Sequence, residues 1–221
     1  MTAPLRKTRV AILISGRGSN MISLIEAAKA PDYPAEIVLV LSNRPEAAGL
    51  AHAASEGIPA RAIDHRDFPD RARFDAALQA ELEAARVELV CLAGFMRIFT
   101  PGFVEGWAGR MLNIHPSLLP LFRGTHTHRQ ALDAGVRLHG CTVHYVVPEL
   151  DAGPIVAQAA VPVRPGDDAD GLADRVIVQE RRLYPAALAL VAGGSARLED
   201  GRVAFDGDVA RADGALLSLA V

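Results

Sequence analysis

Short apolar runs alternate with stretches of helical spacing through the first half of this chain, and this alternation constrains its fold more than any other feature. Four runs have the composition of buried strands: 9–15, 36–42, 60–64 and 87–94. Three segments between them have apolar residues at helical spacing: 19–30, 46–56 and 70–85. Such alternation predicts an α/β fold with an open, doubly wound, mostly parallel sheet that helices cover on both faces.

The second half departs from this strict alternation. Its expected elements are a short helix, a strand, a helix, two further strands and a long final helix: 101–107, 110–115, 125–134, 139–147, 154–163 and about 168–194. Only the turn-like PELDAG separates the last two strands, so we expect them to be antiparallel. Thr125 or Thr127 is expected to cap the helix near 125–134, and Asp167 or Asp168 the final helix.

The domain organisation follows from length and from the lack of a linker. With 221 residues, 50% of them hydrophobic, the chain has enough apolar side chains for one large core. Asp200-Gly201 in the tail is a strong signal for a two-residue hairpin. We therefore expect a single domain over 1–221, with a core at about 8–194 and a hairpin-like tail at 195–221.

Charge and cysteine usage exclude several classes of function. The formal net charge is −3, and no basic run is interleaved with aromatic residues, which argues against nucleic-acid binding. The first ten residues are charged where a signal peptide would be apolar, and the run TRVAILIS is too short to span a membrane. Cys91 and Cys141 lie in apolar segments and are expected to be reduced core residues. We expect a cytoplasmic protein without a membrane partner.

The segment SGRGSN, residues 15–20, follows the first strand and opens the first helix. Its glycines let the backbone approach a ligand, and free N–H groups at a helix start favour an anion. A dinucleotide site would need glycine in place of Met21 and an acidic residue near Ser42 and Asn43. We therefore favour a phosphate-bearing substrate over NAD. The alternative is an ordinary tight turn in which Ser19 or Asn20 caps the helix.

An amide and an imidazole stand two residues apart at the end of the fifth predicted strand, in MLNIHPSLLP. Asn113 and His115 therefore face the same way, toward the crevice at the carboxyl edge of the sheet. An amide can hold a carbonyl oxygen while an imidazole moves a proton or stabilises developing charge. Asp151, in the sharp turn ELDAGP, is the candidate carboxylate to favour the protonated imidazole.

Four histidines near these residues raise the question of a metal: His126, His128, His139 and His144. No carboxylate or cysteine completes a recognisable ligand spacing with them. We expect no metal.

Seven segments in the same order resemble the phosphoribosylglycinamide formyltransferases, enzymes of purine biosynthesis: SGRGSN, LAGFMRIF, NIHPSLLP, GTHTHRQAL, HGCTVHYV, ELDAGPIVAQ and VQERRLYP. NIHPSLLP and the ELDAGP turn are similar to the wider folate-dependent formyltransferase superfamily, whereas SGRGSN and GTHTHRQAL point to this branch. The resemblance covers about residues 8–194. It implies a Rossmann-like formyltransferase fold that transfers the formyl group of 10-formyltetrahydrofolate to the amine of glycinamide ribonucleotide, as a monomer or homodimer.

By position, the resemblance places catalysis at Asn113, His115 and Asp151. It implies that the ribotide is bound by Gly18, Ser19, Asn20 and Glu180. The folate-binding positions that it implies are Arg71, Met96, Arg97, Ile98, Phe99, Asn113, Val147, Pro148, Glu149, Leu150 and Asp151. Val147 and Pro148 depart from the polar residues expected there, which favours backbone contacts. Thr142 and His144 are expected to order water or to position Asp151.

Three other functions share part of this pattern. A 10-formyltetrahydrofolate hydrolase, or a formyltransferase acting on another sugar amine, would share NIHPSLLP and differ at SGRGSN. A non-catalytic ribotide- or folate-binding protein would lack one of the three catalytic side chains, and all three are present. A nucleotide-linked oxidoreductase is disfavoured by Met21 and Asn43.

Overall fold

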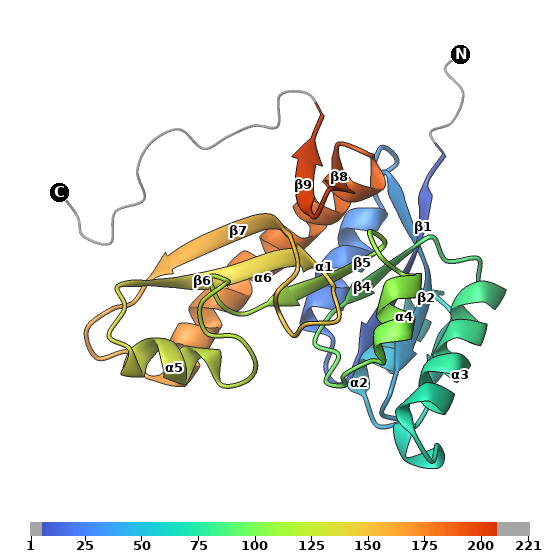
Figure 1. The fold of residues 1–221 in the computed structure, drawn as a ribbon, viewed down its shortest axis with the longest axis horizontal. Helices are drawn as coiled ribbons and strands as arrows, with labels where there is room; N and C mark the ends of the chain where they lie inside the picture. The colour runs from blue at the N-terminus through green and yellow to red at the C-terminus, as the bar shows by residue number, and fades with distance from the viewer. Residues whose placement is uncertain (1–5, 207–221) are drawn as a thin grey trace.

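The computed structural model describes residues 6–206, in which one large sheet is flanked by helices (Figure 1). The seven strands lie in the order β3-β2-β1-β4-β5-β6-β7. Their bounds are β1 (Thr8–Ile14), β2 (Ala35–Ser42), β3 (Ala60–Ala62), β4 (Leu89–Leu92), β5 (Met111–His115), β6 (Leu138–Tyr145) and β7 (Ile155–Pro162).

The first five strands are parallel, and β6 and β7 are antiparallel to their neighbours. The predicted mostly parallel sheet with antiparallel strands in the C-terminal half is therefore confirmed. The chain adds β2 and β3 on one side of β1, and β4 and β5 on the other. This reversal separates the loops that follow β1 and β4, and a ligand site is expected in such a crevice.

Helices cover both faces of the sheet. The α-helices are α1 (Ser19–Ala28), α2 (Ala48–Ser55), α3 (Arg71–Ala84), α4 (Pro101–Gly106), α5 (Thr127–Asp133) and α6 (Ala169–Ala192), and one 3₁₀ turn spans His65–Asp67. On one face α1, α2 and α6 pack on Val10, Ile12 and Ile14 of β1. On the other, α3 and α4 pack on Ala11 and Leu13. Alternate residues of a buried strand thus serve two cores, which explains its continuous apolar sequence.

The predicted helix caps are partly confirmed. Asp168 caps α6 by accepting the Gly171 N–H at 2.8 Å. The cap predicted for α5 was wrong, because His126 occupies the N-cap position and its side chain makes no capping hydrogen bond. The hydroxyl of Thr127 instead donates to the Pro116 carbonyl at 2.7 Å, which ties α5 to the loop after β5.

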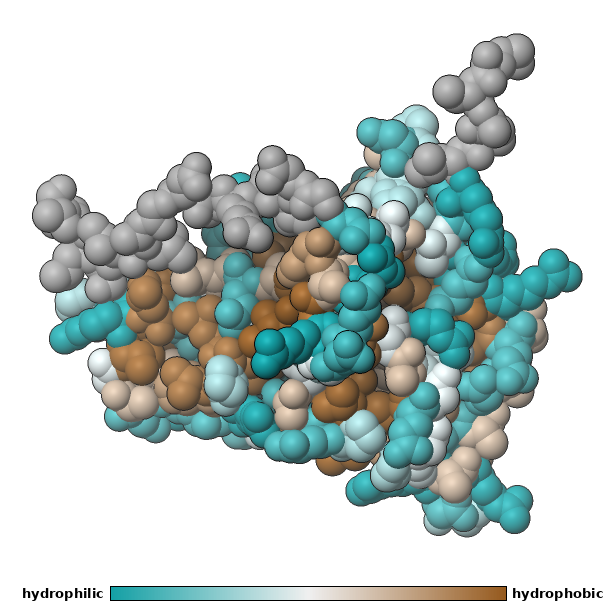
Figure 2. Space-filling view, turned by 45° about the horizontal axis from the view of Figure 1, so that its top comes forward, coloured by the Kyte–Doolittle hydropathy of each residue, from teal (hydrophilic) through white to brown (hydrophobic). Residues whose placement is uncertain are grey.

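The described part of the tail forms the predicted hairpin. Strands β8 (Ala196–Glu199) and β9 (Arg202–Phe205) are antiparallel, and Asp200 and Gly201 make the turn between them. The rest of the predicted tail, from residue 207, lies outside the described residues. Figure 2 shows apolar surface on the face that it views, and the large exposed apolar side chains include Ile155 on β7 and Phe205 on β9.

Cys91 and Cys141 are buried and form no disulfide, as predicted. Within residues 6–206, no helix is both long and apolar enough to cross a membrane.

Candidate active site

A cavity of about 1030 Å³ opens where β1, β4 and β5 end. It gathers the glycine loop after β1, the segment after β4, the end of β5 and the turn before β7. The predicted site residues that line it are Gly18, Ser19, Asn20, Arg71, Met96, Arg97, Ile98, Phe99, Asn113, His115, Val147, Pro148, Leu150, Asp151 and Glu180. Glu149 is absent from this lining, and its exposed carboxylate pairs with Arg123 at 2.6 Å.

His115 ends β5 and is buried with both ring nitrogens beside acceptors. Its Nδ1 lies 3.5 Å from Asp151 Oδ2, and its Nε2 lies 3.0 Å from the carbonyl oxygen of Phe122. A carboxylate and a carbonyl can only accept, so the doubly protonated ring is the form that satisfies both contacts. The predicted pairing of this histidine with Asp151 is thus present in the geometry.

Asp151 is held in place by its own turn. It adopts a left-handed conformation, with φ 49°, and its Oδ2 accepts the Gly124 N–H at 2.8 Å. Two residues later, Gly153 lies so close to β6 that an added Cβ would be 1.7 Å from the Tyr145 carbonyl oxygen. Only glycine allows this approach, so Gly153 fixes the distance between the turn and the sheet.

Asn113 is oriented by a histidine on the neighbouring strand. In the antiparallel pairing of β5 with β6, Asn113 lies opposite His144. His144 Nδ1 is 2.9 Å from the Tyr145 carbonyl, so it must donate, and Nε2 is left to accept from Asn113 Nδ2 at 3.2 Å. Burial lowers the pKa of His144, in keeping with a neutral ring. Among residues 6–206 the second N–H of the Asn113 amide has no acceptor, which leaves it available to a ligand.

The glycine loop leads into α1 without a side-chain cap. Gly18 has φ 71° and occupies the N-cap position, so Ser19 and Asn20 begin the helix rather than capping it. Asn20 Nδ2 donates to Glu180 Oε2 of α6 at 2.6 Å, and both residues are buried. Burial raises the pKa of Glu180, which the Asn20 hydrogen bond opposes. The uncapped start of α1 thus lies at the cavity lining, where backbone N–H groups can bind an anion.

Thr142 lies opposite His115 in the pairing of β5 with β6 and is bonded to the loop after β5. Its hydroxyl donates to the Ser117 carbonyl at 2.7 Å and accepts the Leu119 N–H at 3.1 Å. These two partners belong to the loop after β5, and the hydroxyl also accepts from Gln158 Nε2 of β7 at 3.0 Å, so Thr142 ties that loop to the sheet. It is absent from the cavity lining, whereas His144 lies 4.0 Å from Asp151 Oδ1.

Sequence reasoning missed the residues that hold the segment after β4. The Met96 N–H donates to Ser15 Oγ, whose own proton goes to Asn43, and the Thr100 N–H donates to Asp75. These partners are 25 to 81 residues apart in the chain. No local sequence pattern joins them.

The histidines considered for a metal do not converge on one point. His128 and His139 pack edge to face, with ring centroids 5.3 Å apart. Among residues 6–206, no group of three or more histidine, cysteine or acidic side chains is arranged to hold a metal ion.

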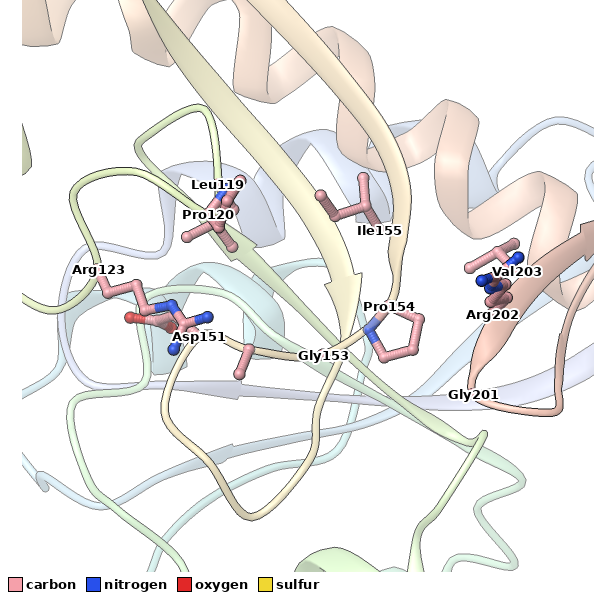
Figure 3. Close-up of a pocket in the computed structure, with 11 residues that line it drawn as sticks. Leu119, Pro120, Arg123, Asp151, Gly153, Pro154, Ile155, Gly201, Arg202 and Val203 are labelled. Carbon is pink, nitrogen blue, oxygen red and sulfur yellow. The ribbon is translucent and has the colours of Figure 1, made fainter.

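A smaller pocket of about 410 Å³ lies behind the Asp151 turn. Figure 3 shows Arg123 beside Asp151 at one side of it, and Arg202 and Val203 of β9 at the other. The hairpin thus contributes to the surface behind this turn.

The formyl transferase family model matches residues 8–188 of the chain. Among curated relatives, the phosphoribosylglycinamide formyltransferase of Escherichia coli (strain K12) is 42% identical over 198 residues, which are 90% of this chain and 93% of that protein. The trifunctional purine biosynthetic protein adenosine-3 of Bos taurus is 51% identical over 201 residues. The chain spans only 20% of that longer relative.

Solved structures give the same result. Glycinamide ribonucleotide transformylase 1 from Symbiobacterium toebii superposes with a TM-score of 0.87 at 43% identity, covering 90% of this chain and 94% of that one. The phosphoribosylglycinamide formyltransferase from Brucella melitensis has a TM-score of 0.82 at 52% identity, covering 86% of this chain and 97% of that one. By sequence and by fold, this chain belongs to the formyl transferase family and, within it, to the phosphoribosylglycinamide formyltransferases.

Proposed function

We propose that this chain transfers the formyl group of 10-formyltetrahydrofolate to the amine of N1-(5-phospho-D-ribosyl)glycinamide, in the biosynthesis of IMP. The observation that carries the proposal is one cavity in which an amide, an imidazole and a carboxylate lie between an uncapped helix start and an apolar-rimmed segment. Family membership supports the same reaction. A cytoplasmic location, a single domain and a monomeric or dimeric state stay predictions.

The two substrates approach the catalytic side chains from opposite loops. The ribotide phosphate binds the N–H groups of Gly18, Ser19 and Asn20, and Glu180 lies beside its ribose and amine end. The folate binds along Met96 to Phe99 and the loop before Asp151, with Arg71 at the cavity wall. This arrangement leaves the amine and the formyl carbon to meet at Asn113 and His115.

The chemistry is an acyl transfer. The neutral amine attacks the formyl carbon, a C–N bond forms, and charge moves onto the formyl oxygen. Asn113 donates its free N–H to this oxyanion and protonated His115 stabilises it, while Asp151 sustains the charge of the imidazole. Collapse then breaks the bond to the folate nitrogen, and the proton lost by the amine reaches that nitrogen through His115 or a water molecule.

One contact must change during this reaction. His115 Nε2 is engaged with the Phe122 carbonyl and Nδ1 faces Asp151. Since the pair with Asp151 is retained, Phe122 has to release Nε2 before that nitrogen can donate to the substrate. Phe122 has φ 56°, a left-handed conformation that costs energy for a residue with a side chain, so a small backbone rearrangement there relieves strain.

A spectrophotometric assay that omits each substrate in turn tests the proposal. We expect turnover only when the ribotide amine and 10-formyltetrahydrofolate are both present, and no loss when a chelator is added. Full turnover without the ribotide would identify a hydrolase. Transfer to a different sugar amine would show that the ribotide is not the acceptor. Loss with a chelator that zinc restores would contradict a metal-free mechanism.

A further inference from the structure

The segment from residue 94 to 100 is bound at residues 96 and 100 by side chains from separate elements. The Met96 N–H donates to Ser15 Oγ at 2.7 Å, and the Thr100 N–H donates to Asp75 Oδ2 at 2.7 Å. Ser15 follows β1, immediately before the glycine loop, and Asp75 belongs to α3. The segment is therefore hydrogen-bonded to the residue after β1 and to α3, which are both distant from it in the sequence.

These two acceptors are themselves buried and oriented. Ser15 is 7% exposed and donates its only hydroxyl proton to Asn43 Oδ1 at 2.6 Å, where Asn43 is 1% exposed. The lone pairs of Ser15 Oγ are thereby left to accept from Met96. Asp75 is 4% exposed in a mainly apolar cluster, and within the described residues only its Oδ2 has a hydrogen-bond partner. Burying a carboxylate costs free energy, so packing alone does not explain an aspartate at position 75.

Between the fixed ends, the segment alternates between core and cavity. Phe95 stacks on Phe99 with centroids 5.2 Å apart, and Phe99 stacks on Phe103 at 4.8 Å. Met96 and Ile98 point outward, with exposures of 68% and 55%. The backbone N–H groups of residues 97 and 98 make no hydrogen bond to any part of the chain that the structure describes. The segment thus presents free polar backbone between two apolar side chains.

We propose that Ser15 and Asp75 are positioning residues for the formyl donor. They accept the N–H groups at the two ends of the segment, so that the free backbone groups between them are already placed to pair with the polar edge of the folate ring. Fixing a binding segment in its bound shape reduces the ordering cost of binding. This inference rests on the proposed function. It assigns a role in donor affinity to two residues that are not among the folate-binding positions.

A purely structural role predicts a different result. If these hydrogen bonds only stabilise the fold, their loss would lower the melting temperature and leave the ratio of the two KM values unchanged. Thr8→Val is the matched control, because Thr8 lies at the opposite end of β1 and its hydroxyl donates to the Ala192 carbonyl at 3.0 Å. Valine is nearly isosteric with threonine and removes a comparable side-chain-to-backbone bond.

The kinetic test compares Ser15→Ala, Asp75→Ala, Asp75→Asn and Thr8→Val. We expect Ser15→Ala and Asp75→Ala each to raise KM for 10-formyltetrahydrofolate by roughly tenfold, or about 1.4 kcal/mol, with the ribotide KM within about twofold. Asp75→Asn keeps a carbonyl oxygen that can accept the Thr100 N–H and should recover most of the donor affinity. Equal changes in both KM values, or donor KM values no higher than that of Thr8→Val, would overturn the inference.

Amide hydrogen exchange of the unaltered protein tests the same claim without a variant. The amides of Met96 and Thr100 should exchange much more slowly than those of Arg97 and Ile98, because only the first two are hydrogen-bonded. Equally fast exchange at all four would show that the segment is not held, and would overturn the inference. Absence of formyl transfer by the wild-type protein would instead contradict the proposed function, and the exchange pattern would still decide whether Ser15 and Asp75 fix the segment.

Discussion

Two histidines on the neighbouring strands β5 and β6 are both buried, yet their surroundings are opposite. His115 has an acceptor beside each ring nitrogen, from Asp151 and from Phe122. His139 packs edge to face with Phe122 and His128, and neither of its nitrogens makes a hydrogen bond of ordinary geometry with the described residues. Burial disfavours the charged form of any imidazole, and the comparison teaches that only His115 has an acceptor beside each nitrogen to offset that cost.

The pKa of His139 reflects its burial without such partners. Burial, and then repulsion by His128, lower it to about 4, and the nearby Pro116 carbonyl opposes the shift only in part. His139 is therefore neutral near pH 7 and contributes packing. We expect catalysis to depend on the region around His115, and the acid sensitivity of folding to depend on the region around His139.

The largest expected effect is the loss of the paired imidazole. His115→Ala should lower kcat by on the order of 10²–10⁴, the usual cost of removing a positioned proton-transfer group. Both KM values should stay within a few-fold, because the binding loops are untouched. Steady-state kinetics with each substrate varied would measure this, and a kcat within tenfold of wild type would remove His115 from the mechanism.

The next largest effect should come from moving Asp151 without changing it. In Gly153→Ala the added Cβ would lie 1.7 Å from the Tyr145 carbonyl oxygen, so the turn must shift away from β6. We expect kcat to fall by about 10², in the lower part of the range for losing such a group. Gly106→Ala is the control, since an added Cβ there meets nothing within 4 Å. Equal kcat in both variants would show that the position of the turn is unimportant.

A change in the glycine loop should alter binding instead of chemistry. Gly18 has φ 71°, and a valine there would be strained and would crowd Met21. Gly18→Val should raise the ribotide KM by roughly tenfold or more, about 1.4 kcal/mol, because the backbone can no longer approach the phosphate. An unchanged ribotide KM together with weak folate binding would mean that the loop serves the other substrate.

The smallest expected effect on activity is that of His139→Leu. We expect kcat within about threefold of wild type, since His139 lies outside the cavity lining. Its folded-state pKa is lowered, so the unfolded chain binds more protons between pH of about 6.5 and about 4, and acid favours unfolding there. Urea unfolding at pH 7 and pH 5 should therefore show a smaller loss of stability in the variant than in wild type. A steeper loss would contradict the neutral state of His139.

The sequence predicted the parallel sheet and the strand end that carries Asn113 and His115, because both follow from local periodicity. Asp151 was predicted from its sharp turn, and the resemblance to formyltransferases assigned it to catalysis. The hydrogen bonds from Ser15 to Met96 and from Asp75 to Thr100 were missed, since they join residues from different elements. The cap of α5 was mispredicted because Thr127 uses its hydroxyl for the Pro116 carbonyl, a tertiary contact that competes with capping.

The central claim is that His115 and Asp151 act as one unit, and a double-mutant cycle tests it most directly. His115→Ala, Asp151→Asn and the double variant would be compared by kcat at saturating concentrations of both substrates. If the carboxylate acts through the imidazole, the double variant should be little slower than the slower single variant. Defects that multiply in the double variant would show that the two side chains contribute independently, and would contradict the account.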